Sequence, residues 1–238
     1  MSDSIFLEAE MHAAYHIGNA AIRHFPYAHF YVENVFPSEF YAKMLKNIPS
    51  ESELSPISEK RPVINIEDRF VLCFDEDSLD SIEAEKSLFW KNFRNTFVGG
   101  RFGTLFMQKF QKNLNKRFGE GSDCKFYDEL LMVQDISGYA LGPHTDSTRK
   151  VITALFYMPP DDSKTELGTS IYLPKDPNFS CEGGPHYLAD GFNKVVTMPY
   201  KPNSMFCFFK NNHSFHGVEQ LASKDYKRSL LLYDIYKE

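Results

Sequence analysis

The sequence predicts a mainly β fold with flanking helices, and three features of the chain lead to this prediction. The first is a series of short apolar runs, bounded by turn residues, which is typical of buried strands. These runs are residues 128–137, 151–157, 205–209 and 229–236. The second is the helical spacing of apolar residues over 81–118. The third is the composition: 42% of the 238 residues are hydrophobic and 22 are Phe, enough for a sizeable core.

The first part of the chain is expected to support this core. Residues 26–36 alternate enough to predict a strand that joins the main sheet. A short helix is expected from Ser38, as its N-cap, to about Asn47. Its apolar stripe consists of Phe40, Tyr41, Met44 and Leu45. Residues 49–69 are polar and contain proline, which indicates a surface loop, with a loop folded over the mouth of the core as the alternative.

Residues 81–118 predict helices that are interrupted at Gly99-Gly100. The apolar residues before the interruption are Leu88, Phe89, Phe93 and Phe97, and those after it are Leu105, Phe106, Phe110 and Leu114. We expect both sets to pack against the outside of the sheet. The basic residues near the end of the second helix are expected on a solvated face, and they are Lys109, Lys112, Lys116 and Arg117.

Size and charge limit the organisation and the partners. A chain of 27.5 kDa fits one domain over 1–238, with strand and helical support over about 1–120 and the core over about 121–238. The net charge of −6 gives no basic footprint for nucleic acid. We find neither a run as long as a membrane span nor the order of a signal peptide. Four cysteines without CxxC spacing fit reduced thiols, so we expect a cytoplasmic protein without nucleic-acid or membrane partners.

A His-x-Asp motif, His144-Thr145-Asp146, lies between two of the expected strands and follows the turn signal Gly142-Pro143. Such a motif is common by chance, and a turn capped by Asp146 is the alternative interpretation. Its position at a strand end favours a functional site, because functional side chains tend to lie on loops held by a rigid sheet.

A second histidine completes a candidate metal site. His144, Asp146 and His216 form the 2-His-1-carboxylate set that holds a non-haem Fe(II) on one face and leaves the other face open for a co-substrate and O₂. His213 competes with His216 for this role. We prefer His216 because Gly217 permits close backbone approach, whereas His213 lies in a turn-like Asn-Asn-His triplet.

Arg228 opens the last expected strand, twelve residues after His216. An arginine beside a run of core residues is costly if it is buried without a partner. It is expected either at an exposed edge beside Lys227 or paired with a carboxylate in bidentate geometry. A fixed cation at this position would suit the distal carboxylate of 2-oxoglutarate.

Together these segments resemble the Fe(II)/2-oxoglutarate-dependent dioxygenase superfamily, and within it the prolyl-4-hydroxylase-like branch. The resemblance covers about residues 128–236 and rests on four pieces in order. They are LGPHTD, KVITALFYMP, PNSMFCFFKNNHSFHGV and KRSLLLYDIY. It implies a double-stranded β-helix, which is a jelly-roll barrel, with the metal near the mouth and 2-oxoglutarate deeper inside. Residues 121–238 would then be the catalytic barrel core.

The resemblance also implies roles for single residues. The iron ligands are matched by His144, Asp146 and His216. Arg228 matches the residue that pairs with the C5 carboxylate of 2-oxoglutarate, and Tyr157 matches a tyrosine that hydrogen-bonds the same carboxylate. A core aromatic is the alternative role of Tyr157. Gln134 falls where relatives often contact the co-substrate, and Thr153 alternates in phase with Tyr157.

The implied activity is hydroxylation of an unactivated C–H bond by an enzyme that uses Fe(II), 2-oxoglutarate and O₂ and releases succinate and CO₂. Halogenating relatives replace the carboxylate ligand with a small residue, so the presence of Asp146 favours hydroxylation. Two other classes stay open: a cupin-like metal enzyme that does not use 2-oxoglutarate, and a non-catalytic ligand-binding barrel. Arg228 argues against both.

The substrate and the oligomeric state are open at the level of sequence. A peptidyl proline and a small molecule such as a free amino acid, a sugar or a lipid fit equally, because fold does not fix substrate. Arg149 and Lys150 are candidate substrate contacts, since paired cations suit a carboxylate or a phosphate, with exposed turn residues as the alternative. In the long segment 159–192, His186 and Tyr187 are further candidates.

Overall fold

The computed structural model describes residues 3–61, 66–222 and 225–238. Its α-helices are α1 (Asp3–Asn19), α2 (Ser38–Lys46), α3 (Ile57–Lys60), α4 (Glu76–Asp80), α5 (Ala84–Phe97), α6 (Arg101–Lys109) and α7 (Gln111–Phe118). Its strands are β1 (His29–Glu33), β2 (Ser55–Pro56), β3 (Arg69–Cys73), β4 (Phe126–Asp135), β5 (Leu141–His144), β6 (Lys150–Tyr157), β7 (Thr169–Pro174), β8 (Phe192–Met198), β9 (Ser204–Phe209), β10 (His216–Val218) and β11 (Arg228–Lys237). The 3₁₀ turns are η1 (Glu51–Glu53), η2 (Thr165–Leu167) and η3 (Ala189–Gly191).

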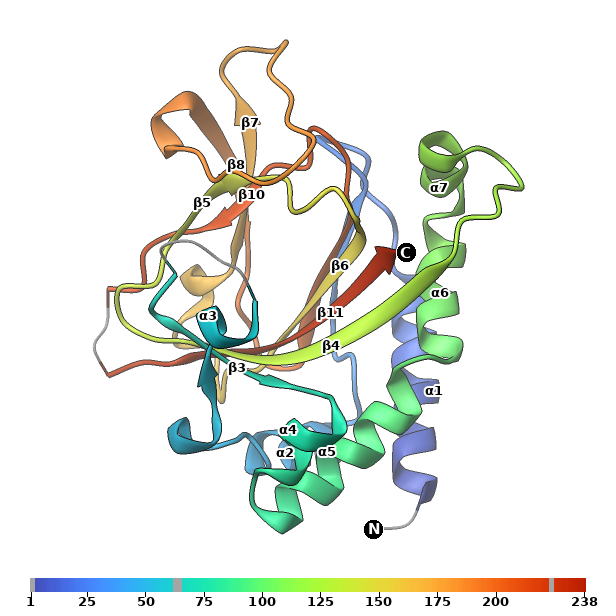
Figure 1. The fold of residues 1–238 in the computed structure, drawn as a ribbon, viewed down its shortest axis with the longest axis vertical. Coiled ribbons are helices and arrows are strands. Elements are labelled where there is room, and N and C mark those ends of the chain that lie inside the picture. The colour runs from blue at the N-terminus through green and yellow to red at the C-terminus, as the bar shows by residue number, and fades with distance from the viewer. Residues whose placement is uncertain (1–2, 62–65, 223–224) are drawn as a thin grey trace.

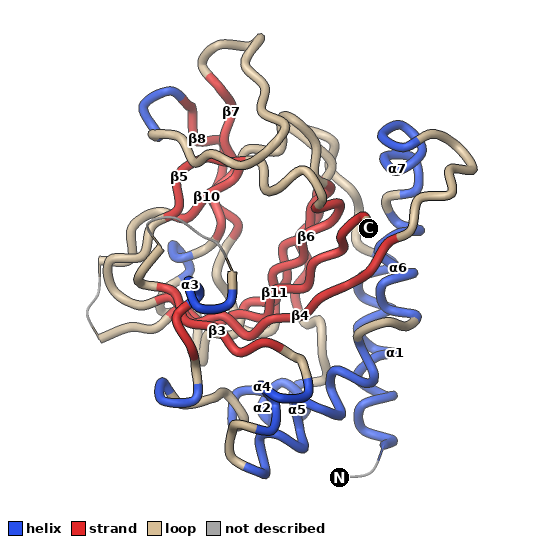
Figure 2. Tube along the Cα trace, viewed as in Figure 1, coloured by secondary structure: helices blue, strands red, loops and turns tan. Residues whose placement is uncertain are grey.

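The described strands form two antiparallel sheets (Figures 1 and 2). The larger sheet has seven strands in the order β1-β9-β6-β11-β4-β3-β2, and the smaller has four in the order β5-β10-β7-β8. In the longest pairing, β11 runs against β4 from Arg228 opposite Asp135 to Lys237 opposite Phe126. The C-terminal half therefore supplies the smaller sheet and the centre of the larger one. Strands β1, β2 and β3 extend the larger sheet at both edges, and the expected mainly β fold with helices is confirmed.

The helices cover one face of the larger sheet. In Figure 1, α1, α5, α6 and α7 follow the side of β4 and β11 that is turned away from the smaller sheet. An aromatic cluster fills this layer, with Phe89, Phe93 and Phe97 of α5 each at most 3% exposed. Burial of a Phe side chain contributes about 1.5–3 kcal/mol, so this layer is a main source of stability.

The opposite face of the larger sheet contacts a second hydrophobic cluster between the two sheets. Because strand side chains alternate between faces, Leu231 and Tyr233 of β11 join the helical layer, whereas Leu230 and Leu232 point between the sheets. The same alternation determines which polar side chains of β4, β6 and β11 reach the space between the sheets.

The structure differs from the sequence predictions in four details. Pro37 occupies the N-cap of α2 and Ser38 is its first helical residue, so the predicted cap is wrong. The segment 49–69 contains η1, β2 and α3 within its described part rather than only loop. The helical region breaks a second time at Phe110, between α6 and α7, and Leu88 is 52% exposed.

Among the described residues, no helix combines the length and the apolar character needed to cross a membrane.

Candidate metal centre

Two strands of the smaller sheet bring the candidate histidines together. His144 is the last residue of β5, His216 is the first residue of β10, and the two lie directly opposite each other in the antiparallel register. Their ring centroids are 4.2 Å apart. A Cβ atom at position 217 would collide with the carbonyl oxygen of Leu141, so only glycine lets β10 approach β5 this closely.

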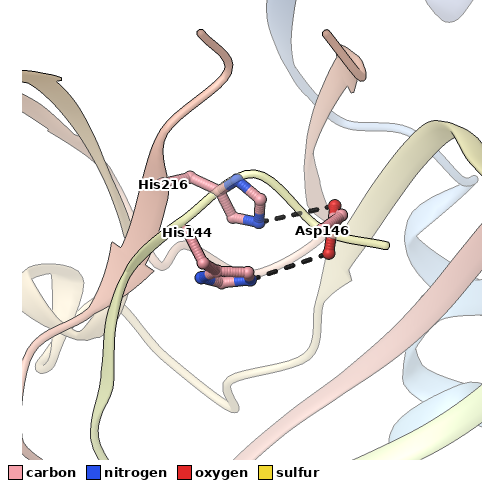
Figure 3. A group of neighbouring side chains, drawn as sticks. All are labelled: His144, Asp146 and His216. Atoms are coloured by element: carbon pink, nitrogen blue, oxygen red, sulfur yellow. Dashed lines mark ion pairs between the residues drawn. The ribbon is translucent and has the colours of Figure 1, made fainter. Parts of the chain in front are cut away.

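Asp146 reaches the two imidazoles from a tight turn that follows β5. Its φ of 65° lies in the left-handed region, which Asp tolerates better than most residues. Its Oδ1 atom lies 3.6 Å from Nε2 of His144, and its Oδ2 atom lies 3.6 Å from Nε2 of His216. Figure 3 shows both rings directed at this carboxylate. One ligand atom from each residue lies within 4.8 Å of the others.

The backbone fixes both histidines in the form that binds metals. Nδ1 of His144 is 3.0 Å from the carbonyl oxygen of Gly142, and Nδ1 of His216 is 2.9 Å from that of Ser214. Because a carbonyl only accepts, each Nδ1 carries the hydrogen and each Nε2 presents a lone pair toward Asp146. Two ring nitrogens and a carboxylate therefore face one another as three acceptors, an arrangement that a cation satisfies.

The spacing of these donors fits a transition-metal ion. Metal-to-ligand distances of about 2.0–2.2 Å separate neighbouring ligand atoms by about 3–4 Å, close to the separations of 3.6 Å seen here. Two imidazoles and one carboxylate on one side, with the other side open, are the ligand set of non-haem Fe(II) sites that activate O₂.

Two further side chains hold the carboxylate of Asp146. The Thr153 hydroxyl donates to Oδ2 at 3.1 Å, and the ammonium of Lys150 lies 3.2 Å from Oδ1. Lys150 also lies 3.0 Å from Asp234. Burial alone would raise the pKa of Asp146, but Lys150 and the two histidines hold that pKa well below its usual range. The Asp146 carboxyl is therefore charged at neutral pH.

The charge states of His216 and Lys150 follow from their surroundings. Burial, together with the neighbouring His144, lowers the pKa of His216 to about 3, so the ring is neutral and able to bind a metal at neutral pH. Burial would lower the pKa of Lys150 as well, but Asp146 and Asp234 raise it above its usual value. Lys150 is therefore a cation.

Arg228 belongs to a buried network of two arginines and one aspartate. Arg69 donates two hydrogen bonds to the Asp135 carboxylate, from Nε at 2.6 Å and from Nη2 at 3.0 Å. Nη1 of Arg228 lies 2.7 Å from the same carboxylate. Nε of Arg228 donates to the carbonyl of Leu167 at 2.6 Å. Asp135 and Arg228 are at most 1% exposed. Two guanidinium groups and one carboxylate leave a net positive charge in a buried place, which favours an anion there.

Two tyrosines adjoin this network. The Tyr157 hydroxyl accepts the backbone N–H of Thr169 at 3.1 Å, and the guanidinium of Arg228 lies 5.7 Å from the Tyr157 ring. The Tyr139 ring lies 4.3 Å from the guanidinium of Arg69. The buried hydroxyl of Tyr139 finds no hydrogen-bond partner among the described residues, so its O–H is a donor that a bound group can use.

A cavity of about 790 Å³ opens beside two of the candidate ligands, His144 and Asp146. Its described lining comes from the β5 turn, the segment before β3, the end of β11 and the long segment before β8. The lining residues are Arg61, Ile66, Ala140, Leu141, Gly142, His144, Asp146, Ser147, Lys150, Gly184, Pro185, His186, Tyr187, Leu188 and Tyr236. The volume is that of a small-molecule site. The segment 49–69 thus contributes Arg61 and Ile66 to the lining of this cavity.

Of the residues that the sequence singles out, the structure brings together His144, Asp146, His216, Thr153 and Lys150. Thr153 contacts the carboxylate of Asp146 in this structure. Arg228 and Tyr157 lie together in the adjoining network, as described above.

Two predicted residues, Gln134 and Arg149, and the alternative histidine, His213, lie elsewhere. Gln134 follows Val133, which points between the sheets, so the side chain of Gln134 points to the other face and lies 3.3 Å from the Ser229 hydroxyl. Arg149 is exposed and donates to the Tyr127 hydroxyl. His213, the alternative second histidine, is exposed in its turn.

Sequence reasoning missed four charged or polar residues near the site: Arg69, Asp135, Tyr139 and Asp234. The signal for Asp234 was available, because an acid inside the apolar run Leu230–Tyr236 is costly unless it is paired. Asp135, at the end of the strand before the His-x-Asp motif, gives the same signal.

Comparisons with known proteins concern the fold. No family model and no curated protein matches this chain. The solved structure of the epimerase SnoN in complex with Fe³⁺, alpha-ketoglutarate (2-oxoglutarate) and nogalamycin RO has a TM-score of 0.50 and 12% identity, over 95% of this chain and 83% of that one.

Two prolyl 4-hydroxylases are also similar. The enzyme from Phytophthora capsici has a TM-score of 0.50 and 12% identity, over 99% of this chain and 65% of that one. The enzyme from Pseudomonas putida has a TM-score of 0.48 and 12% identity, over 95% and 99%. The sequence resemblance is therefore confirmed at the level of the fold, which this chain shares with solved structures of 2-oxoglutarate-dependent and prolyl-hydroxylating enzymes.

Proposed function

We propose that this protein is an Fe(II)- and 2-oxoglutarate-dependent oxygenase that hydroxylates an unactivated C–H bond. The observation that carries the proposal is the convergence of His144, Asp146 and His216 as three acceptors, two of which, His144 and Asp146, line a cavity of about 790 Å³. This ligand set, with an open side, is the one used by non-haem Fe(II) oxygenases. The shared fold with SnoN and with a prolyl 4-hydroxylase supports it.

The architecture of the proposed enzyme is a double-stranded β-helix, or jelly-roll barrel, over about 121–238. The two antiparallel sheets with a hydrophobic cluster between them support this assignment. The region of about 1–120 would be its strand and helical support, in a single domain over 1–238. The contribution of β1, β2 and β3 to the larger sheet favours one domain over two.

In this proposal His144, Asp146 and His216 hold Fe(II), and the open side faces the co-substrate and O₂. Iron and 2-oxoglutarate bound there would supply oxidative decarboxylation to succinate and CO₂, and with it the oxidant for the C–H bond. The chain supplies orientation. The carbonyls of Gly142 and Ser214 hold the imidazoles, and Thr153 with Lys150 holds the carboxylate.

The network of Arg69, Asp135 and Arg228 would hold the distal carboxylate of 2-oxoglutarate. Its surplus positive charge would be neutralised by that carboxylate, and the Tyr139 hydroxyl is a donor in need of an acceptor. Tyr157 would contact the same end of the co-substrate, beside Arg228. A buried cationic subsite of this kind has no role in a cupin-like enzyme that uses the metal alone, which is why we favour the oxygenase.

The test is the O₂-dependent conversion of 2-oxoglutarate to succinate by the Fe(II)-loaded protein. We expect succinate from the wild type even without the true substrate, at a low uncoupled rate. Asp146→Ala should lose it, and Asp123→Ala, which removes an exposed carboxylate, should retain it. Succinate no higher than in a chelator-treated sample would contradict the proposal and favour a cupin-like enzyme or a ligand-binding barrel.

A further inference from the structure

One end of the cavity is lined by two cations that flank a tyrosine. Nη1 of Arg61 lies 3.4 Å from the Tyr236 hydroxyl, and the ammonium of Lys150 lies 5.9 Å from the centre of the Tyr236 ring. All three residues line the cavity together with His144 and Asp146. The two cations therefore face the same space as the proposed metal ligands.

Both cations have acidic partners, and one of these, Asp234, also accepts the Tyr236 hydroxyl at 3.2 Å. Arg61 pairs with Glu129 of β4, and Lys150 pairs with Asp234 of β11 at 3.0 Å. Among the described lining residues Asp146 is the single acid, and it pairs with Lys150 at 3.2 Å. Both cations therefore line the cavity, whereas Glu129 and Asp234 are not among its described lining residues.

Both cations are suited to hold an anion. The Lys150 side chain is 9% exposed and that of Arg61 is 26% exposed, so the charge of a bound anion would be weakly screened. A lysine ammonium carries three N–H donors, of which Asp146 and Asp234 use two. The guanidinium of Arg61 has five donors in a planar fork that matches a carboxylate or a phosphate.

We infer that the end of the cavity formed by Arg61, Lys150 and Tyr236 binds the anionic group of the substrate, a carboxylate or a phosphate, while the rest of the substrate extends toward His144 and Asp146. This inference rests on the proposed function and names the substrate class of the same site. The subsite is separate from the co-substrate network, because neither Arg69 nor Arg228 is among the described residues that line the cavity.

The probes are 4-fluorobenzoate and 4-fluorophenyl phosphate, with 4-fluorobenzamide as the neutral control. Binding to the metal-free protein is followed by ¹⁹F line broadening. We expect at least one of the two anions to bind and the amide not to bind. Preference for the benzoate would assign a carboxylate, and preference for the phosphate ester would assign a phosphate.

Variants locate the binding. Arg61→Gln should weaken the anion at least about tenfold, the loss expected for one charge-assisted hydrogen bond. Arg61→Lys, which keeps the charge and serves as the control for folding, should retain most of the affinity. Arg149→Gln, which removes an exposed cation outside the cavity lining, should bind as the wild type does.

Three results would overturn the inference. These are equal binding of the neutral amide, equal affinity in Arg61→Gln and Arg149→Gln, and a loss of 2-oxoglutarate affinity in Arg61→Gln, which would place the co-substrate at this end instead. The anion titration uses neither iron nor turnover. Its outcome is therefore separate from that of the succinate measurement, which tests the oxygenase activity itself.

Discussion

At Asp146, both carboxylate oxygens are held by neighbours before any metal arrives: Thr153 donates to one, and Lys150 lies close to the other. Hydrogen bonds of this kind orient a ligand, and their removal typically costs about 10–100-fold in metal affinity. We therefore expect Thr153→Val, which keeps the shape of the side chain, to weaken Co(II) or Fe(II) binding by about tenfold or more, as measured by titration.

The matched control is Thr197→Val, which removes a hydroxyl that contacts Ser170 between β7 and β8, on the smaller sheet. It should bind the metal as tightly as the wild type. Equal affinity in Thr153→Val and the wild type would show that Thr153 does not orient the ligand.

The location of a site residue could be predicted from sequence where it does not depend on which face of a strand the side chain points to. His144, Asp146 and His216 lie at strand ends, where a turn directs the side chain, and the structure brings them together. Gln134 lies inside β4, where a shift of one residue reverses the face, so it points away while Asp135 reaches Arg228. Residue types alone do not indicate which of two neighbouring strand residues points to the site.

At the scale of elements, the approach of β10 to β5 decides whether the two histidines meet. Gly217→Ala would place a methyl group against the carbonyl of Leu141 and push the strands apart. We expect metal affinity to fall by about tenfold or more, because a binding site loses affinity steeply when its ligands move by an ångström. Titration of Co(II) into the variant measures the effect.

Gly191→Ala is the matched control, because a Cβ at position 191 would meet no atom within 4 Å and the residue has no positive φ. It should leave metal affinity unchanged. If Gly217→Ala also bound the metal normally, close packing of β10 on β5 would not be what positions His216.

Helix α7 stabilises the turn that carries the proposed ligand. Arg117, expected from the sequence on a solvated face, is half-buried and donates to the carbonyls of Thr148, Lys150 and Lys210 at 2.8, 2.8 and 3.0 Å. We expect Arg117→Gln to lower the free energy of unfolding by about 1–2 kcal/mol and to speed amide exchange in residues 147–151.

Lys116→Gln, on the exposed neighbouring position, controls for the loss of one positive charge. Urea unfolding and hydrogen exchange should show little change in that variant. Unchanged exchange around Lys150 in Arg117→Gln would mean that the turn is held by other contacts.

Strands with a continuous apolar run could be predicted from sequence, and a strand without such a run could not. The strands β6, β9 and β11 carry continuous apolar runs and lie where the sequence places them. Strand β7 lies in a stretch rich in Pro, Gly and Asp, and its partners β8 and β10 come later in the chain. Its strand conformation therefore depends on tertiary pairing more than on its own residues.

For the whole molecule, the buried His216 predicts how stability depends on pH. Its pKa is lowered to about 3, whereas an unfolded histidine titrates near about 6.5. Between these values the unfolded chain binds a proton that the folded chain does not, so a fall in pH favours unfolding. We expect the free energy of unfolding of the metal-free protein to drop from pH 7 to pH 4, and to drop less in His216→Gln.

The contribution of His216 to the pH dependence of stability falls in a different pH range from that of Asp146. The lowered pKa of Asp146 contributes stability above its usual value of 3.8, which is lost only at lower pH. Urea unfolding at intervals between pH 7 and pH 4, with a chelator present, measures the difference. Parallel curves for the wild type and His216→Gln would contradict the assigned state of His216.

Whole-molecule organisation was only partly visible in the sequence. The mainly β class and the helical cover follow from periodicity, as confirmed by the two sheets and the helical layer (Figure 2). The strand expected over 26–36 does join the larger sheet, as β1, but its pairing with β9 and the addition of β2 and β3 at the other edge are contacts between distant segments. Periodicity indicates that a segment is a strand but does not indicate its partner.

The central claim is that one site binds both Fe(II) and 2-oxoglutarate. Its most direct test is anaerobic titration of the Fe(II)-loaded protein with 2-oxoglutarate, following the weak visible metal-to-ligand charge-transfer band. We predict a saturable band in the wild type and in Arg149→Gln, no band in His216→Ala, and a band that needs at least about tenfold more 2-oxoglutarate in Arg228→Gln. The absence of a band in the wild type at saturating 2-oxoglutarate would contradict the account.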